Sequence, residues 1–207
     1  MGRGSRVHAV VPGDLAGLLP GCQGHPELEY ALHDPAAGWA RAAMAQWGLC
    51  GVAMHDEQDA PVAQALVCPG LNLPPEHPLV HWSKLPDAAY LLALVTHTDD
   101  DEAAHAQVRL LVQGLARHLH GQVDTLEAVG RHAAPSCLEP PVGWLTAAGF
   151  QPVDEFRADG CQRLRLDLGT TVRWRPDLAR AWHLLGGLVP RPVPPAEPTG
   201  RQGRTQQ

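Results

Sequence analysis

Residues 89–130 constrain the fold of this chain more than any other stretch of it. An apolar run is followed by a turn rich in acids, and a long amphipathic segment then leads to a second apolar run. The amphipathic segment carries apolar residues with the spacing of one helical face: Val108, Leu111, Val112, Leu115 and Leu119. Two strands joined by a crossover helix form a βαβ unit. We therefore predict that Ala88–Val95 and Thr125–Val129 are neighbouring parallel strands joined by a Glu102–His120 helix.

Four acids, at Asp99, Asp100, Asp101 and Glu102, stand where the predicted helix begins. A helix N-terminus just beyond a buried parallel strand is a common place for a phosphate group in α/β proteins. The local negative charge argues against a phosphate here, because like charges repel. The same acids could instead satisfy the helix N-terminus themselves, since acids in a first turn stabilise a helix without any ligand. Both interpretations stay open at this point.

The flanking segments predict further helices and strands around this unit. Before it we expect, in order, a strand Arg6–Val11, a short helix capped by Asp14, an irregular stretch 22–33, a helix opened by Asp34 and Pro35 with an apolar face of Trp39, Ala43, Met44 and Trp47, a hairpin of Gly48–Met54 and Pro61–Val67, and a loop Leu71–Asp87. After it we expect a helix Pro140–Ala148, a second hairpin of Val153–Arg157 and Cys161–Leu168, and a helix Asp177–Leu185. One domain should cover residues 5–188, followed by a disordered Pro-rich tail, 189–207.

Charge and hydropathy argue against two classes of partner. The chain has 207 residues, a formal net charge of −6 and a pI near 6.0, whereas nucleic-acid binding needs a clustered basic face. The sequence lacks an apolar run of about 18 residues, the length needed to span a membrane. Its N-terminus also lacks a signal-peptide core. We therefore expect a cytoplasmic protein that binds neither nucleic acid nor membrane.

The five cysteines are odd in number and widely spaced, which is typical of reduced, buried thiols in a cytosolic protein. For Cys137, near the start of a late helix, a buried inert thiol is favoured over an activated one. Zinc ligands could come from two groups: Cys22 with His25, and Cys68 with His77 and His81. Neither group contains a CxxC pair, so we predict no metal site.

Several local sequences carry a resemblance to a known family. They are RVHAVVPGDLAGLL, VRLLVQGLARHL followed by VDTLEAVG, and CLEPPVGWLTAAGFQPV. These resemble the opening strand and helix, the cofactor-side helix with its next strand, and the late helix of the GNAT acyltransferases. RLRLDLGTTVRWRPD and WGLCG look like one bacterial branch of that family. The resemblance implies an α/β (α+β) fold with a mixed central sheet of about seven strands flanked by helices. It also implies acetyl-CoA or another acyl-CoA as co-substrate, an amine acceptor, and pairing into a homodimer.

The resemblance further implies which residues would hold the cofactor. The family has a Q/R-x-x-G-x-G/A turn whose backbone amides bind the acyl-CoA pyrophosphate. The matching segment here, Ala103–Val108, contains no glycine. The implied cofactor-binding residues are Leu94 and Val95, whose amides would stabilise the oxyanion, and His105, Ala106, Gln107, Val108 and Arg109. Without glycines, and beside four acids, this pyrophosphate site is predicted to be degenerate, weakened or lost.

The catalytic residues are less clearly implied. Many relatives place a Tyr general acid where this chain has Leu145, with Trp144 beside it, and neither side chain can donate that proton. Glu127 is our candidate general base, because a carboxyl group buried beside the cleft is a stronger base than an exposed one. Its alternative role is that of a structural carboxylate paired with Arg163 or Arg165.

Three functions therefore stay open from the sequence. The predicted function is that of a GNAT-like N-acetyltransferase, which transfers an acyl group from acetyl-CoA or another acyl-CoA to an amine. The alternative is a catalytically inactive GNAT-fold protein with a binding or regulatory role, since a fold does not fix a function. A small metalloprotein that uses Cys and His is the weakest of the three.

Overall fold

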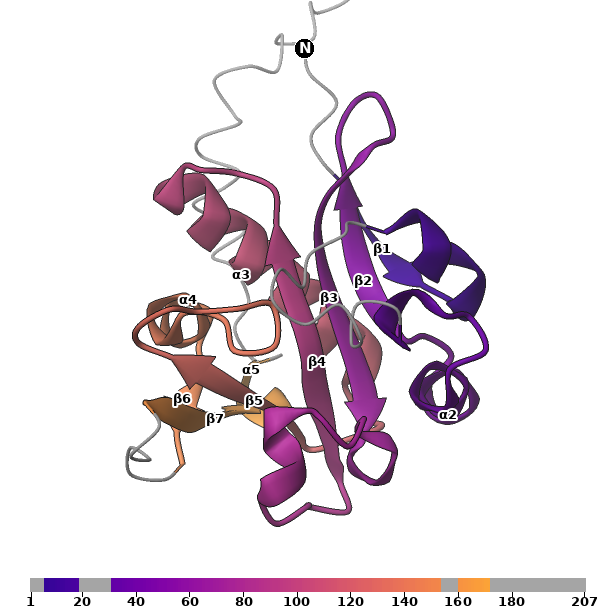
Figure 1. Cartoon of the computed structure of the whole chain (residues 1–207), viewed down its shortest axis with the longest axis vertical. Coiled ribbons are helices and arrows are strands. Elements are labelled where there is room, and N and C mark those ends of the chain that lie inside the picture. Colours follow the sequence, from indigo (N-terminus) through magenta and orange to yellow (C-terminus); the bar gives the residue numbers. More distant parts are fainter. Residues whose placement is uncertain (1–5, 19–30, 154–159, 172–207) are drawn as a thin grey trace, which may run out of the picture. The chain divides into compact units, whose positions relative to one another are not determined.

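A computed structural model describes residues 6–18, 31–153 and 160–171 of the chain. Its centre is a seven-stranded sheet in the order β1-β2-β3-β4-β5-β7-β6 (Figure 1). The strands are β1 (Arg6–Val10), β2 (Gly51–His55), β3 (Pro61–Pro69), β4 (Ala88–Thr96), β5 (Thr125–Arg131), β6 (Gln151–Pro152) and β7 (Cys161–Asp167). Every neighbouring pair is antiparallel except β4 and β5, which are parallel. The predicted mixed sheet and its βαβ unit are confirmed.

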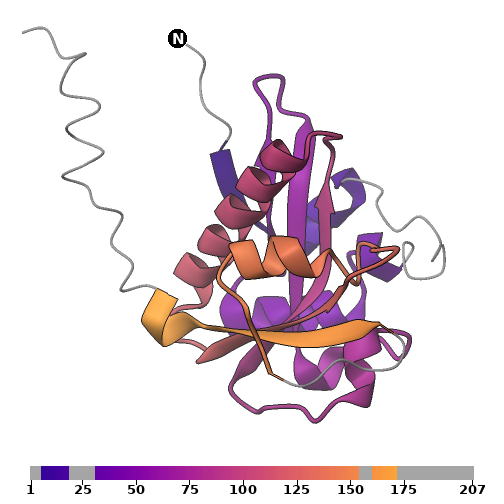
Figure 2. The same cartoon turned by 90° about the vertical axis from the view of Figure 1, so that its left-hand side faces the viewer.

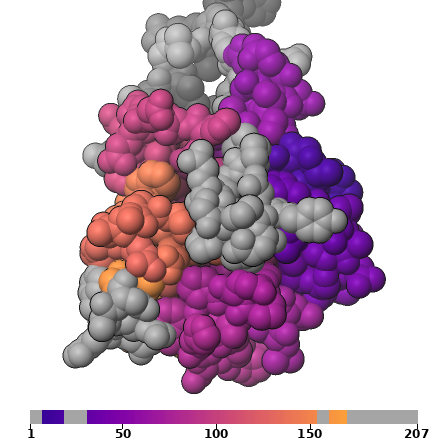
Figure 3. Space-filling view, in the orientation of Figure 1, coloured from indigo at the N-terminus to yellow at the C-terminus, as the bar shows by residue number. Residues whose placement is uncertain are grey.

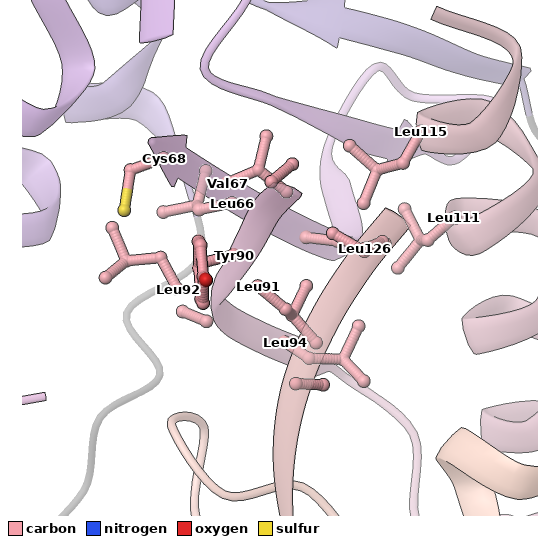
Figure 4. Close-up of a cluster of buried hydrophobic side chains, with 14 of the residues drawn as sticks. Leu66, Val67, Cys68, Tyr90, Leu91, Leu92, Leu94, Leu111, Leu115 and Leu126 are labelled. Carbon is pink, nitrogen blue, oxygen red and sulfur yellow. The ribbon is translucent and has the colours of Figure 1, made fainter. Parts of the chain in front are cut away.

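Helices and short helical turns connect these strands. They are η1 (Pro12–Gly17), α2 (Gly38–Trp47), η2 (Gly70–Asn72), η3 (Pro78–His81), α3 (Asp101–Leu119), α4 (Val142–Ala147) and α5 (Leu168–Thr171). The long helix α3 packs against the sheet, and Figure 4 shows Leu111 and Leu115 close to Leu126 of β5. α4 lies on the same side of the sheet as α3 (Figure 2). Within the described residues, no helix combines the length and the apolar character needed to cross a membrane.

The β5–α4 packing depends on the absence of a side chain at Gly130. A Cβ atom there would lie 2.9 Å from Val142 and 3.1 Å from Leu145, closer than ordinary van der Waals contact. α4 can therefore pack directly on the backbone of β5. At the other end of the unit, α3 ends at Leu119, and Gly121 just beyond it takes the left-handed conformation common after helix C-termini, with φ of +78°.

Two helix starts differ from the predictions. The helix predicted to be capped by Asp14 is the 3₁₀ turn η1, and its N-cap is Val11, whose N–H donates to the Asp14 carboxylate at 3.0 Å. The second helix, α2, begins at Gly38 rather than at Pro35. Asp34 accepts a hydrogen bond from Ala36 N–H at 2.8 Å, so it closes a turn before α2 instead of capping the helix.

Smaller differences concern the same region and the far end of the domain. Residues 31–33 are helical, although an irregular stretch 22–33 was expected, and Met44 on the expected apolar face of α2 is 39% exposed. The structure has the short strand β6 at Gln151–Pro152, just before the strand predicted at Val153–Arg157. Val153 is not part of a strand, and residues 154–157 lie outside the described part of the chain. The Asp177–Leu185 helix and the 189–207 tail also lie outside it, so the 5–188 domain boundary stays a prediction.

The connection between β3 and β4 covers the lower part of the sheet face that Figure 3 presents. Its η3 turn is closed by Lys84, the only lysine in the sequence. The Lys84 ammonium donates to the carbonyl oxygens of Leu79, Val80 and Trp82 at 2.9, 2.6 and 2.9 Å. All three of its protons therefore stabilise the backbone of this connection.

Removing the side chain of Leu115 tests the packing of α3. Leu115 is fully buried, whereas Leu110 on the same helix is 43% exposed. Leu115→Ala should lower the free energy of unfolding by about 2–5 kcal/mol, because it leaves a cavity under the helix. Leu110→Ala should change it by less than about 1 kcal/mol. Urea denaturation measures both values, and equal losses would contradict this placement of α3.

Candidate functional site

The two parallel strands separate soon after they meet. β4 and β5 pair only at Ala88↔Thr125, Ala89↔Leu126 and Tyr90↔Glu127. Beyond these pairs β4 continues to Thr96 alongside β3, and β5 continues alongside β7. We call the space between β4 residues 91–96 and β5 residues 128–131 the wedge. Its opening leaves backbone groups of β4 without a strand partner on that side.

A β-bulge marks β4 just beside the wedge. On β3, Leu66 pairs with Ala93 and Val67 pairs with Leu91, so Leu92 is an extra residue between the two pairs. Figure 4 shows the Leu92 side chain pointing away from Leu126 of β5. The bulge shifts the alternation of β4, and so it determines which amides face the wedge.

His77 fixes the bulge from the β3–β4 connection. The side chain is fully buried, and its Nε2 lies 3.1 Å from the Leu92 carbonyl oxygen. Its Nδ1 accepts from Leu79 N–H at 3.2 Å, so Nε2 carries the proton and donates to Leu92. Burial lowers the pKa of His77 to about 4, and the positive charge of Lys84 acts in the same direction. Both ring nitrogens are hydrogen-bonded to the backbone. Neither is therefore available to bind zinc together with Cys68 and His81.

One wedge-facing amide of β4 is already in a hydrogen bond. Leu94 N–H donates to the carbonyl oxygen of Cys137, 2.8 Å away, in the segment between β5 and α4. Successive amides of a strand point to opposite sides. Val95 N–H therefore points toward β3, where Val95 pairs with Gln64, and Thr96 N–H points toward the wedge again. Of the two residues predicted to stabilise an oxyanion, the structure directs the amide of Leu94 into the wedge and that of Val95 away from it.

The N-terminus of α3 is capped by its own acids. Asp100 is the N-cap, and its carboxylate accepts from Glu102 N–H at 3.0 Å. Its carbonyl oxygen accepts from Ala104 N–H at 2.9 Å, which begins the regular helical pattern. The structure therefore shows the second interpretation of the acidic turn, in which the acids cap the helix themselves. An open hollow of about 340 Å³ lies at the turn before α3, lined by Thr96, His97, Thr98 and Asp99.

The other predicted cofactor residues lie inside α3 rather than in a turn before it. His105, Ala106, Gln107, Val108 and Arg109 follow the first turn, where helix amides bond to carbonyl groups of the preceding turn. Val108 is fully buried in the core, while Ala106 and Arg109 are exposed. The amides left without helical partners belong to the first turn, Asp101–Ala103.

Trp144 of α4 joins this helix start. Its indole N–H donates to the Asp101 carboxylate at 3.0 Å, and the His105 ring meets the indole edge-on with centroids 6.3 Å apart. Its neighbour Leu145, at the position where many relatives carry a Tyr, is fully buried. The α3 and α4 helices are thus linked at the start of α3, where the sequence analysis considered a pyrophosphate site.

Glu127 lies at the point where β4 and β5 part, and it is fully buried. Its Oε2 accepts from Arg163 Nε at 2.8 Å and its Oε1 from Arg165 Nε at 2.5 Å. Arg163 also donates to the Ser83 carbonyl oxygen at 3.1 Å. Both carboxylate oxygens are therefore engaged by guanidinium groups, as expected of the structural carboxylate that the sequence analysis left as an alternative.

Tyr90, opposite Glu127, was not singled out from the sequence. Its hydroxyl oxygen accepts from Leu85 N–H at 2.7 Å, and burial raises the pKa of its phenol. A lone tyrosine inside an apolar run was the only signal for it.

No protein-family model matches this sequence, and no curated protein does either. Solved structures of the aminoglycoside acetyltransferase AAC(6')-Ib are similar to this one. Its complex with ribostamycin and coenzyme A has a TM-score of 0.53 at 15% identity, covering 84% of this chain and 98% of that chain. A complex with coenzyme A alone has a TM-score of 0.51 at 13% identity, covering 83% and 99%. The chain has the GNAT fold. The fold that the sequence resemblance implied is confirmed.

The cysteines of this GNAT-fold chain have different environments. Cys50, Cys68 and Cys161 are buried and not disulfide-bonded. Burial raises the pKa of Cys50 to about 12 and that of Cys68 further. Cys137 is disulfide-bonded, so the prediction of reduced thiols is wrong there, and Cys137 offers no nucleophilic thiol. In residues 6–18, 31–153 and 160–171 we find no group of three or more His, Cys, Asp or Glu side chains suited to a metal ion.

The low pKa of His77 predicts a pH-dependent stability. Its folded-state pKa is about 4, below the ordinary 6.5, so unfolding takes up a proton between these values. This contribution to the free energy of unfolding is complete above pH 6.5 and is lost as the pH falls to 4. It amounts to at most about 3 kcal/mol. His77→Gln keeps a donor and an acceptor without titrating, so its unfolding free energy in urea should fall less between pH 7 and 4.

The same substitution at an exposed position, His97→Gln, provides the matched control. Parallel curves for the wild type and His77→Gln would contradict the buried, neutral state of His77.

Replacing Glu127 separates its two roles. Glu127→Ala should lower the free energy of unfolding by about 3 kcal/mol, because Arg163 would stay buried without its partner. Glu57→Ala, at an exposed position of the β2–β3 turn, should change it by about 0.5 kcal/mol or less. Thermal and urea unfolding measure the loss. An unchanged stability of Glu127→Ala would contradict the structural role and favour the general base.

Proposed function

We propose that this chain binds an acyl-CoA, most simply acetyl-CoA, with the acyl end in the wedge, and transfers the acyl group to an amine. One observation carries the proposal. In a GNAT fold, the Leu94 amide points into the wedge, the region beyond the last β4–β5 pair, where it donates to a carbonyl oxygen. The bound AAC(6')-Ib structures contain coenzyme A, and that enzyme acts on aminoglycosides, which supports an acyl-CoA and an amine as the two partners.

The backbone donors of β4 that face the wedge suit the acyl and pantetheine half of such a molecule. Leu94 N–H now donates to a carbonyl oxygen, the kind of acceptor that a thioester or an amide presents. Thr96 N–H, two residues along β4, faces the same space and can serve the next acceptor. A bound acyl-CoA would supply an activated thioester carbonyl at this point.

The start of α3 fits the pyrophosphate half poorly. Asp100 already uses the amide of Glu102, and Asp101 is held by Trp144. A carboxylate about 6 Å from a phosphate costs roughly 2–3 kcal/mol at an effective dielectric of about 20, before screening by salt. Binding should therefore rest mainly on the pantetheine half, and His105–Arg109 stay predicted contacts only.

The chemistry needs no component beyond the two substrates. The amine nitrogen attacks the thioester carbonyl carbon, the C–S bond breaks, and the proton that the nitrogen gives up ends on the CoA thiol. Leu94 N–H would stabilise the oxyanion that forms in between. Glu127 would first have to release Arg163 or Arg165 to accept a proton. The proposal therefore assigns the rate enhancement to positioning and to the Leu94 amide.

A second function is favoured by a specific observation. Cys137 occupies the Leu94 amide and Asp100 caps α3, so both expected cofactor donors are used by the chain itself. A GNAT-fold protein without catalysis, with a binding or regulatory role, would have this arrangement permanently.

Titration of acetyl-CoA against the full-length protein separates the two functions. A thiol reductant is present, because Cys137, whose carbonyl oxygen accepts from Leu94 N–H, is disulfide-bonded. We expect binding, seen by calorimetry and as a rise in thermal stability, of about 2.7 kcal/mol when the ligand is at 100 times its dissociation constant. S-acetylpantetheine should retain most of the affinity, while 3′-phospho-ADP should bind weakly because of the acids at α3. Transfer of the acetyl group to a polyamine or aminoglycoside panel then tests catalysis.

Absence of binding at millimolar acetyl-CoA would contradict the acyltransferase and leave the non-catalytic function. Tighter binding of 3′-phospho-ADP than of S-acetylpantetheine would contradict the wedge as the main contact.

A further inference from the structure

The wedge holds a short piece of the chain itself. Ser136–Glu139, which we call the wedge segment, follows β5 and lies against β4 through the Cys137–Leu94 hydrogen bond of 2.8 Å. It forms a closed turn, in which Ser136 N–H donates to the Glu139 carbonyl at 3.0 Å and Glu139 N–H donates to Ser136 Oγ at 3.2 Å. Cys137 and Leu138 are 6% and 3% exposed. The segment is therefore packed into the wedge and not merely passing over it.

Glu139 anchors the wedge segment to the strands behind it. Its carboxylate forms two hydrogen bonds with Arg131 at the end of β5, at 2.6 Å to Nε and 3.0 Å to the second nitrogen. Cys161 at the start of β7 donates its S–H to the same carboxylate at 3.0 Å. Arg131 N–H also donates to the Pro140 carbonyl at 3.0 Å. A bidentate pair of this kind fixes both distance and orientation.

The Leu94 amide can donate to only one acceptor at a time. While the Cys137 carbonyl holds it, a thioester or pantetheine oxygen cannot use it. The two acceptors therefore compete for one proton, and a ligand must displace the wedge segment to bind there.

We propose that the wedge segment is an intramolecular competitor of the acyl-CoA, and that the Glu139–Arg131 pair sets how strongly it competes. The inference rests on the proposed function, because it concerns the same wedge. The apparent dissociation constant then equals the intrinsic one divided by the fraction of molecules with an open wedge. Weakening the anchor raises that fraction and tightens acyl-CoA binding without any new contact.

Glu139→Gln tests this directly, because it keeps the size of the side chain and removes its charge. We expect its apparent dissociation constant for acetyl-CoA to be about tenfold lower than that of the wild type. The Leu94 amide should also exchange its hydrogen about tenfold faster, relative to other β4 amides. Every titration contains a thiol reductant, because Cys137 is disulfide-bonded and would otherwise resist displacement.

The same chemical change at an exposed glutamate, Glu57→Gln, is the matched control and should alter neither quantity. Ser136→Ala serves as a milder second variant if Glu139→Gln fails to fold. It removes the acceptor of Glu139 N–H, and it should tighten binding severalfold.

The outcomes distinguish this inference from the proposed function. Tighter binding together with faster Leu94 exchange supports both. Binding that is unchanged or weaker in Glu139→Gln and Ser136→Ala overturns the competition and leaves the proposed function standing. No acetyl-CoA binding by any variant, with faster Leu94 exchange in Glu139→Gln, overturns the proposed function and the competition with it.

Discussion

Backbone amides of β4 need acceptors, and this requirement shapes the region around the wedge. Once β4 and β5 part after Tyr90↔Glu127, β4 has lost its neighbour on one side while it remains buried. Leaving a buried amide without a partner costs free energy, so other parts of the chain supply the missing groups. The Cys137 carbonyl serves Leu94, and His77 serves the carbonyl of the bulge at Leu92. The β3–β4 connection and the β5–α4 segment thus stabilise the same short stretch from two directions.

The charged side chains around this stretch of β4 and β5 are also paired with one another. Glu127 engages Arg163 and Arg165 beneath the β3–β4 connection, and Glu139 engages Arg131 at the far end of β5. Buried or half-buried pairs of this kind add little to stability over an apolar core, but breaking one is costly. Their main effect here is to hold β5, β7 and the wedge segment in one register. The acids at α3 act differently. Asp100 caps the start of the helix, and Asp101 accepts a hydrogen bond from Trp144.

The sequence was sufficient where a periodic pattern carried the information. The apolar spacing of α3 and the continuous apolar run of β4 predicted the parallel unit, and motif resemblance predicted a mixed sheet of about seven strands. The bulge could not be predicted from this apolar run. A strand buried on both faces has no alternation of apolar and polar residues, so an extra residue leaves no trace in the pattern. The cofactor residues were placed by counting back from Arg109, which put them inside α3, since the helix already begins at Asp101. Contacts between distant segments, such as Leu94 with Cys137, leave no local pattern at all.

The position of Lys84 has a practical consequence for experiments on this protein. It is the only lysine, and its ammonium protons all point at backbone carbonyls of the β3–β4 connection. A chemist who relies on lysine-directed cross-linkers or dyes has no freely exposed side-chain ammonium to aim at. Interfaces of this molecule are better mapped through its carboxylates, which are numerous and spread along the sequence.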